Sequence, residues 1–340
     1  MGKLRTLSII LTFCLVAGLM FATGSEAKEV TIKFATANPE NSYHGVFGLA
    51  FKKYAEQMSN GRIKVELFLS GQMGSEQDNV NQVSSGIIQM STQAVNNVTP
   101  FASIVGFCTL PYMWNSFDEA WAVLDSPLKK ELNKTMVKQG NFRALAWLTG
   151  GFRVLTNSKK PVRTLEDLKG LRIRVPKNEI MIQAYKAWGI NPVPMAWTEV
   201  FNALQQRVVD GQDNPYAAIP QEKFYEVQKY ITNIHYILWI GPALVNEKWY
   251  QGLPADLRKI VDEAALKAQN DERKWAVGNE GKACLEAIEH GMEVTVPANN
   301  EKEWIEKAKS IWPNFYDKIG GKDFVDQVIA FLDKYRKGKR

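Results

Sequence analysis

The sequence predicts an α/β protein of two lobes, each a mainly parallel sheet flanked by helices. Two observations carry this prediction. The chain has 340 residues, and one hydrophobic core rarely serves more than about 250 to 300 residues, so two domains are expected. Strand-like and helix-like segments also alternate along the chain, and the alternation begins again after Gly150 and Gly151. Such alternation is typical of parallel sheets.

The first lobe opens with two units of strand and helix. Residues 29–34 and 63–69 alternate apolar and polar side chains, as strands with one buried face do. Residues 43–58 and 75–86 instead carry their apolar side chains at helical spacing. This order predicts that the two strands run parallel in one sheet.

The second lobe repeats the order of strands and helices. One strand is predicted at 152–156 and another at 171–175, where Pro176 ends it. Helices are predicted over 164–168, 179–188 and 198–206, with Thr198 placed to cap the last of them.

One long helix is predicted from Pro254 to about Glu289, because apolar residues recur at helical spacing without an internal proline. A helix of this length can brace both lobes. The chain has no Gly/Ser-rich tether, so we expect chain crossings to join the lobes into a hinged clamp. The predicted division assigns residues 28–150 and about 240–279 to lobe I, and residues 151–239 and about 280–340 to lobe II.

The first residues predict export. Lys3 and Arg5 precede an uncharged run at 7–23, and a small-residue cleavage site follows at Ala27. This pattern predicts a secretory signal peptide over residues 1–27. No later segment has the roughly 20 consecutive apolar residues that a bilayer requires, so the mature chain is expected to be soluble and unanchored.

Nucleic acid is not expected as a partner. The chain has 42 Lys and Arg against 36 Asp and Glu, a formal charge of +6. A nucleic-acid surface would concentrate basic residues and aromatic residues on one element, whereas here both signs are mixed along the predicted helices.

No cofactor, metal or catalytic residue is expected. His44, His235 and His290 lack a Cys or His neighbour at ligand spacing, and His235 lies in an apolar run typical of a core histidine. The chain has no Gly-x-Ser-x-Gly elbow, phosphate loop or dinucleotide-binding glycine motif. Cys108 and Cys284 are interpreted as free thiols.

Two predicted strands each carry an arginine among apolar residues. These are Arg153 and Arg174, and alternation puts Arg172 on the same face as Arg174. A guanidinium group stays charged and fits a carboxylate with two parallel hydrogen bonds. Each buried arginine therefore needs an anion, which is either an internal Asp or Glu or the carboxylate of a ligand.

Several ordered motifs carry a family resemblance. They are GLRIRVP at 170–176, PMAWTEV at 194–200 and VDGQDNP at 209–215, with GQMG at 71–74 and FYEVQK at 224–229 in support. In this order they resemble the solute-binding proteins of tripartite ATP-independent periplasmic (TRAP) transporters, the DctP family. The resemblance covers essentially the whole mature chain and implies a two-lobed, periplasmic-binding-protein-like fold.

The resemblance implies roles for four residues of the second lobe. Arg174, in the strand before Val-Pro, matches the arginine that anchors the ligand carboxylate, and Arg153 matches an arginine that assists it. Asn214 matches a ligand-contacting asparagine. Trp197 falls at the aromatic position after Pro-Met-Ala, where it either walls the pocket or packs in the core.

The first lobe offers two further candidates. Glu76 and Gln93 fall near segments that face the cleft in relatives. Ala37 and Ala94 occupy places that are polar in binders of acidic sugars, which argues against a ligand like sialic acid.

The function implied is that of an extracytoplasmic solute-binding subunit. It would bind a small organic acid in the periplasm as a monomer and deliver it to the membrane permease subunits, with uptake driven by an ion gradient. Two alternatives use the same ligand chemistry: an exported enzyme of organic-acid metabolism, and a binding protein that serves a sensor kinase.

The identity of the acid stays open in the sequence. A single carboxylate anchor suits C4-dicarboxylates, 2-oxo and hydroxy acids, and aromatic acids. Trp197, Phe152 and Trp239 favour an apolar or aromatic tail, although the apolar neighbours of Trp239 are equally typical of core burial.

Overall fold

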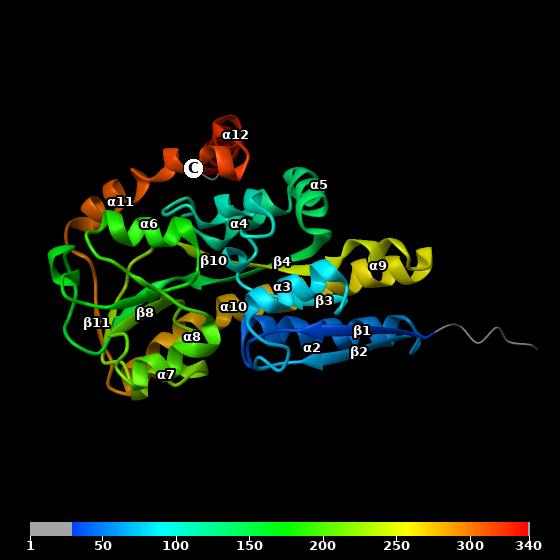
Figure 1. Cartoon of the computed structure of the whole chain (residues 1–340), viewed down its shortest axis with the longest axis horizontal. Helices are drawn as coiled ribbons and strands as arrows, with labels where there is room; N and C mark the ends of the chain where they lie inside the picture. The colour runs from blue at the N-terminus through cyan, green and yellow to red at the C-terminus, as the bar shows by residue number, and fades with distance from the viewer. Residues whose placement is uncertain (1–28, 339–340) are drawn as a thin grey trace, which may run out of the picture.

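The computed structural model describes residues 29–338, so the predicted signal peptide at 1–27 lies outside the described residues. Within this range the strands form two sheets that lie side by side in Figure 1. The first has the order β2-β1-β3-β10-β4 and comprises β1 Val30–Ala35, β2 Ile63–Phe68, β3 Met90–Thr92, β4 Phe142–Phe152 and β10 Leu238–Asn246. The second has the order β11-β9-β5-β8-β6-β7 and comprises β5 Val154–Asn157, β6 Ile173–Val175, β7 Val193–Pro194, β8 Gly211–Asn214, β9 Tyr230–Thr232 and β11 Glu293–Thr295.

The predicted two-lobed α/β fold is confirmed, and both of its sheets are mixed rather than mainly parallel. In the first, β1 is parallel to β2 and β3, but β10 is antiparallel to β3 and β4. In the second, β6 is parallel to β7 and β8 and β9 is parallel to β11, but β5 is antiparallel to β8 and β9. The chain leaves the first sheet through β4 and returns to it through β10, so these two crossing strands must run in opposite directions.

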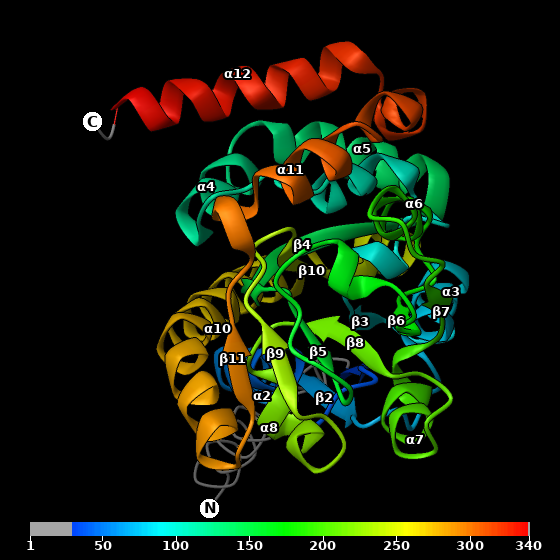
Figure 2. The same ribbon diagram turned by 90° about the vertical axis from the view of Figure 1, so that its left-hand side faces the viewer.

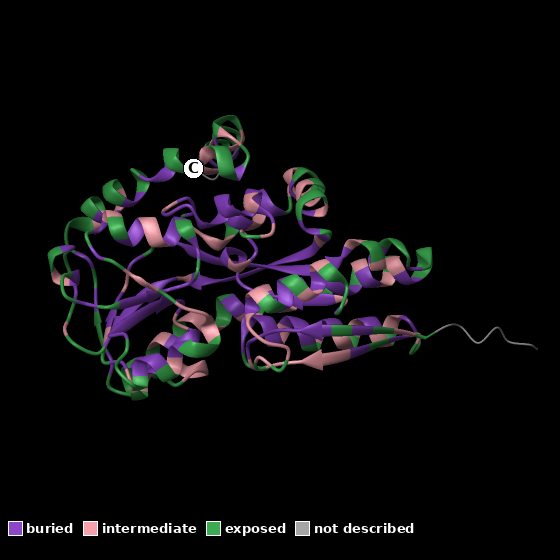
Figure 3. Ribbon diagram, viewed as in Figure 1, coloured by how far each residue is buried: buried purple, intermediate pink, exposed green. Residues whose placement is uncertain are grey.

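Helices cover the sheets on their outer sides, which Figure 3 shows as exposed surfaces around buried strands. Their bounds are α2 Tyr43–Met58, α3 Glu76–Ser85, α4 Phe117–Leu124, α5 Leu128–Gly140, α6 Glu179–Ala187, α7 Val200–Gln205, α8 Ala218–Gln221, α9 Glu247–Gln251, α10 Ala255–Glu289, α11 Lys302–Lys309 and α12 Lys322–Gly338.

Local sequence explains where the helices of the first lobe begin and end. The Ser42 side chain accepts from the Gly45 amide at the start of α2. Ser75 and Asp78 form a capping box on α3, and Gly86 ends that helix with a φ of 81°. The expected cap at Thr198 is wrong, because α7 begins after a short 3-10 turn and has no side-chain cap.

The long helix α10 confirms the predicted brace. It packs against α2 and β4 of the first lobe and against α8, which follows β8 of the second sheet. Two buried side chains of α10 also satisfy the free edge of β4: Gln269 Oε1 accepts from the Trp147 amide at 2.7 Å and Glu272 Oε2 from the Thr149 amide at 3.3 Å. The helix therefore occupies the place that a further strand would take.

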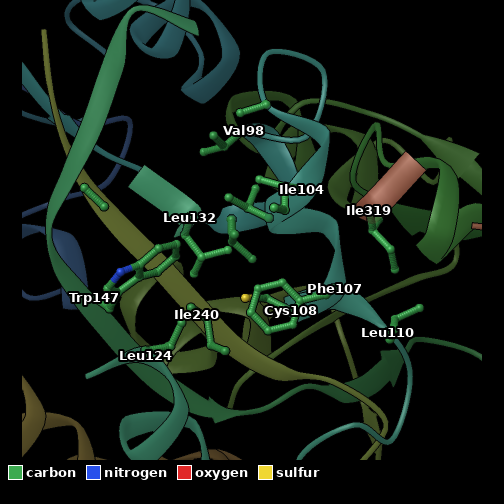
Figure 4. Packing of buried hydrophobic residues seen from close by; sticks show 14 of the residues in the cluster. Val98, Ile104, Phe107, Cys108, Leu110, Leu124, Leu132, Trp147, Ile240 and Ile319 are labelled. Carbon is green, nitrogen blue, oxygen red and sulfur yellow. The ribbon is translucent and has the colours of Figure 1, made fainter. Parts of the chain in front are cut away.

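The largest buried cluster lies under α4, α5 and α12. Figure 4 shows part of this cluster, with Phe107, Cys108 and Ile319 among its labelled members. Cys108 is buried, Cys284 is partly exposed, and both are free.

The C-terminal segment departs from the predicted lobe boundaries. The prediction placed residues 280–340 with lobe II, but α12 packs against α4, which lies on β4 of the first sheet. Figure 2 shows α12 running across the helices of that side. The Arg336 guanidinium donates to both carboxylate oxygens of Glu119, at 2.9 and 2.8 Å, and fastens the helix there.

Candidate ligand-binding site

A cavity lies between the lobes. Much of its lining lies at or just after the carboxyl ends of β1, β3, β6 and β8, and the rest includes residues of α2, α3, α8 and β10. In α/β proteins ligands bind at the carboxyl ends of strands. Five predicted residues line this cavity: Arg174, Arg153, Asn214, Trp197 and Glu76.

Arg174 is a buried cation of the site, and its guanidinium has no ion-pair partner among residues 29–338. Its side chain comes from β6 and is 3% exposed. Nε and Nη2 donate to the Met195 carbonyl oxygen, at 3.1 and 2.7 Å, and the guanidinium lies 6.0 Å from the centre of the Trp197 ring. Burial and the charge of Arg153 lower the pKa of Arg174 to about 10, so it is charged at neutral pH.

Arg153 is buried as well, but its charge is matched internally. Its Nε donates to Asp213 Oδ2 at 2.9 Å and its Nη2 to the Asp213 carbonyl at 2.5 Å. Tyr236 donates a second hydrogen bond to the same carboxylate oxygen. Arg153 thus has the internal partner that the sequence left open as one alternative.

Glu76, at the start of α3, brings a carboxylate into the same cavity. It accepts from Asn38 Nδ2 at 3.3 Å and from the Ala94 amide at 3.2 Å, and Asn97 donates to its second oxygen. Burial raises the pKa of Glu76, and the Ala94 amide and the charge of Arg174 oppose the rise. The side chain is therefore an acceptor held rigidly opposite the guanidinium.

Aromatic rings form one wall of the cavity. Trp239, 6% exposed, stacks on Tyr43 at 5.0 Å between ring centres and meets the edge of His44 at 5.0 Å. Burial lowers the pKa of His44 to about 3, so the ring is neutral at neutral pH. Both sequence interpretations of Trp239 thus hold, because it is buried and also lines the cavity.

Amide side chains supply the remaining polar groups. Asn214 Nδ2 donates to Gln212 Oε1 at 2.7 Å, which fixes the orientation of the Asn214 side chain. Asn96 lines the cavity, and its buried Nδ2 has no hydrogen-bond partner among the described residues. A buried amide donor without a partner costs free energy unless a ligand or water accepts from it.

The structure places three residues elsewhere than the sequence interpretation did. Gln93 is fully buried outside the lining, where it accepts from Ser91 Oγ at 2.7 Å and donates to the Pro242 carbonyl at 3.2 Å. Phe152 packs on the ring of His235 rather than in the cavity. His235 is exposed, with Nδ1 3.1 Å from Glu301 Oε1, and is not a core histidine.

Several lining residues belong to none of the sequence motifs. They are Asn38, Tyr43, His44, Asn96, Asn97 and Gln221. A signal for one of them is present in the sequence, because Asn38 follows the first predicted strand, whereas Asn96 and Asn97 follow β3, which the sequence did not predict. Polar residues directly after parallel strands face the ligand in α/β folds.

Two kinds of feature are absent from residues 29–338. In this range, no cluster of three or more His, Cys, Asp or Glu side chains is placed to hold a metal ion. Likewise, none of the helices in this range has the length and apolar character needed to cross a membrane.

Comparisons with known proteins agree on one family. The chain matches the model described as bacterial extracellular solute-binding protein, family 7, over residues 34–319. The 2,3-diketo-L-gulonate-binding periplasmic protein of Escherichia coli is 28% identical over 293 residues, which cover 86% of this chain and 88% of the relative.

Solved structures show the same fold. A sugar acid binding protein from Advenella mimigardefordensis, in complex with galactonate, has 29% identity and a TM-score of 0.86, and covers 90% of this chain and 99% of its own. A TRAP periplasmic solute binding protein from Rhodobacter sphaeroides, described as apo, open and partially disordered, has 36% identity, the same coverage and a TM-score of 0.76. The chain therefore belongs to family 7 of the bacterial extracellular solute-binding proteins, the solute-binding proteins of TRAP transporters, which are binding proteins and not enzymes.

Proposed function

We propose that this chain captures a small organic acid in the periplasm, pairs its carboxylate with Arg174, and delivers it to the membrane permease for uptake driven by an ion gradient. The observation that carries the proposal is the buried guanidinium of Arg174, which has no carboxylate partner among the described residues. Leaving such a charge without an anion is costly, and a ligand carboxylate supplies that anion.

The site favours one carboxylate on the ligand. Arg153, the second guanidinium of the cavity, is already paired with Asp213 at 2.9 Å. A second ligand carboxylate would therefore meet no free cation and would face Glu76. The amide groups of Asn96 and Asn214 suit hydroxyl groups instead.

Some ligands named for relatives fit the same chemistry, although two relatives were solved with succinate, a dicarboxylate. One relative is named for 2,3-diketo-L-gulonate and another was solved with galactonate, and both ligands combine one carboxylate with several oxygen functions. We accordingly propose a hydroxylated monocarboxylic acid as the ligand class, in place of the apolar or aromatic tail that the sequence favoured.

Capture would proceed by closure of the lobes. Arg174 and Asn214 belong to strands of the second sheet, whereas Glu76 and Tyr43 belong to helices of the first lobe. The galactonate complex has a higher TM-score against this chain than the apo, open relative has, although its sequence identity is lower. This difference supports a closed arrangement of the lobes here. Ligand would select this closed state, and the permease would recognise it.

Thermal unfolding against a panel of acids tests the proposal. The panel is galactonate, erythronate, pantoate, succinate and a benzoate, each paired with an uncharged counterpart such as galactitol. Ligand at 100 times its dissociation constant adds about 2.7 kcal/mol to the free energy of unfolding. A hydroxylated monocarboxylate should therefore raise the melting temperature, and its uncharged counterpart should not. The proposal fails if no acid shifts the transition, or if acid and counterpart act equally.

A further inference from the structure

Glu280 lies directly behind the ligand cavity, on the helix that braces both lobes. It comes from the last part of α10 and is partly buried. The Tyr43 hydroxyl, from α2 of the first lobe, donates to Glu280 Oε1. Because Tyr43 lines the cavity and stacks on Trp239, this hydrogen bond ties a wall of the ligand site to the bracing helix.

The same carboxylate also faces the second lobe. The backbone N–H groups of Tyr216 and Ala217 lie close enough to Glu280 to lower its pKa, and these residues follow Asn214 at the end of β8. Ala217 is 2% exposed and belongs to the buried cluster that contains Tyr43. Glu280 therefore has partners from both sides of the cleft.

The chain crossing between the sheets completes the arrangement. The Gly151 N–H, near the end of β4, donates to the Tyr43 hydroxyl at 3.2 Å. A Cβ at position 151 would lie 1.9 Å from Glu280 Oε2. A side chain at this position would therefore push the Glu280 carboxylate away from the crossing.

Opening the cleft cannot preserve all of these contacts. Tyr43 moves with the first lobe and the segment 216–217 moves with the second, so separation exposes the Glu280 carboxylate to water. We propose that Glu280 takes up a proton when the lobes close around the ligand, so that ligand affinity rises as the pH falls. This inference rests on the proposed function, because closure is argued from ligand capture.

The surroundings of Glu280 support this direction. Burial raises its pKa from 4.5 to about 6, and the Tyr43 hydroxyl and the nearby amides of Gly151, Ala217 and Tyr216 only partly oppose the rise. The titratable groups that face this region are Tyr43 of α2, Tyr216 after β8, and Glu272 and Cys284 of α10. The pKa values of both tyrosines and of Glu272 are raised, so none of these groups offers the carboxylate a positive charge.

The sign of the pH dependence follows from these values. A carboxyl whose pKa is higher in the closed form binds more protons there, so acid favours closure and the effect fades above pH 6. For pKa values of 4.5 in the open form and about 6 in the closed form, the association constant rises about fourfold from pH 7.5 to 5.5. In Glu280→Gln an uncharged amide replaces the carboxyl, so this pH-dependent rise in the association constant should be absent.

Titration calorimetry with galactonate at pH 7.5 and 5.5 tests the inference on the wild-type protein and on Glu280→Gln. Glu76 also has a raised pKa and contributes equally to both proteins, so the difference between them isolates Glu280. Glu289→Gln, an exposed position on the same helix, is the matched control and should behave as the wild type. Equal pH dependence of the wild type and Glu280→Gln would overturn the inference.

A second arm separates this inference from the proposed function. If no acid of the panel binds to the wild type, the proposed function fails, and small-angle X-ray scattering of the unliganded proteins at the same two pH values then decides on Glu280 alone. Because a proton on Glu280 favours the closed form, acidification should lower the radius of gyration of the wild type more than that of Glu280→Gln. An identical change in both proteins would overturn the role of Glu280.

Discussion

At the scale of single residues, three arginines of similar sequence context have three different environments. Arg172 is half exposed and pairs with Asp210 at 2.9 Å, Arg153 is buried and pairs with Asp213, and Arg174 is buried without a carboxylate partner among the described residues. Alternation along a strand predicts which face an arginine occupies. It does not predict which acidic residue the fold brings to that face.

The buried pair of Arg153 and Asp213 carries the first prediction. Asp213→Asn leaves the Arg153 guanidinium buried without an anion, and breaking such a pair costs about 3 to 5 kcal/mol. The free energy of unfolding, measured in urea, should fall by that amount. Asp326→Asn is the control, because Asp326 and its partner Lys322 are both exposed and the loss there should be about 1 kcal/mol or less. Equal losses would show that Asp213 does not hold a desolvated charge.

The site residues could be predicted only where the resemblance to the family pointed to them. Arg174, Arg153, Asn214, Trp197 and Glu76 all line the cavity. Gln93 does not, because its side chain, directly after β3, turns to the Pro242 carbonyl of β10. The tertiary fold decides such cases, since two lobes distant in sequence build the cavity together.

At the scale of elements, amphipathic segments were predictable and fully buried ones were not. The helix predicted at 43–58 is α2 with the same bounds. By contrast β4 begins at Phe142, ten residues before the predicted strand, and β10 was not predicted. Almost every residue of both strands is buried, and a strand covered on both faces loses the alternation that identifies it.

The contact between α10 and the edge of β4 carries the second prediction. Gln269→Leu removes the acceptor of the buried Trp147 amide, and an unsatisfied buried donor costs about 1 to 3 kcal/mol. Urea unfolding should show this loss. Asn270→Leu, at an exposed position of the same helix, should leave the free energy of unfolding within about 0.5 kcal/mol. Stability that is unchanged in Gln269→Leu would mean that α10 does not substitute for a strand.

At the scale of the whole molecule, the fold joins two lobes by two crossing strands and one bracing helix. β4 and β10 pair with each other from Asn246 to Leu238 on one strand and from Phe142 to Phe152 on the other. Arg153, at the crossing itself, donates its amide to the Ile237 carbonyl at 2.9 Å. Such a junction permits rotation of one lobe on the other without a flexible tether.

Closure of the lobes carries the third prediction. Saturating acid should lower the radius of gyration measured by small-angle X-ray scattering, because the lobes approach as the ligand is enclosed. The Arg174→Ala protein should keep its unliganded radius at the same acid concentration, and galactitol should change neither protein. A radius that is unaffected by a bound acid would contradict a hinged clamp.

The central claim is that Arg174 holds the ligand carboxylate, and one calorimetric comparison tests it most directly. The tightest acid of the panel is titrated into the wild type, Arg174→Ala and Arg172→Ala. Two charge-assisted hydrogen bonds, each worth about 1.5 to 3 kcal/mol, predict at least a roughly 100-fold loss of affinity in Arg174→Ala. Arg172→Ala should bind as the wild type does. Unchanged affinity in Arg174→Ala, with its fold intact by circular dichroism, would contradict the account.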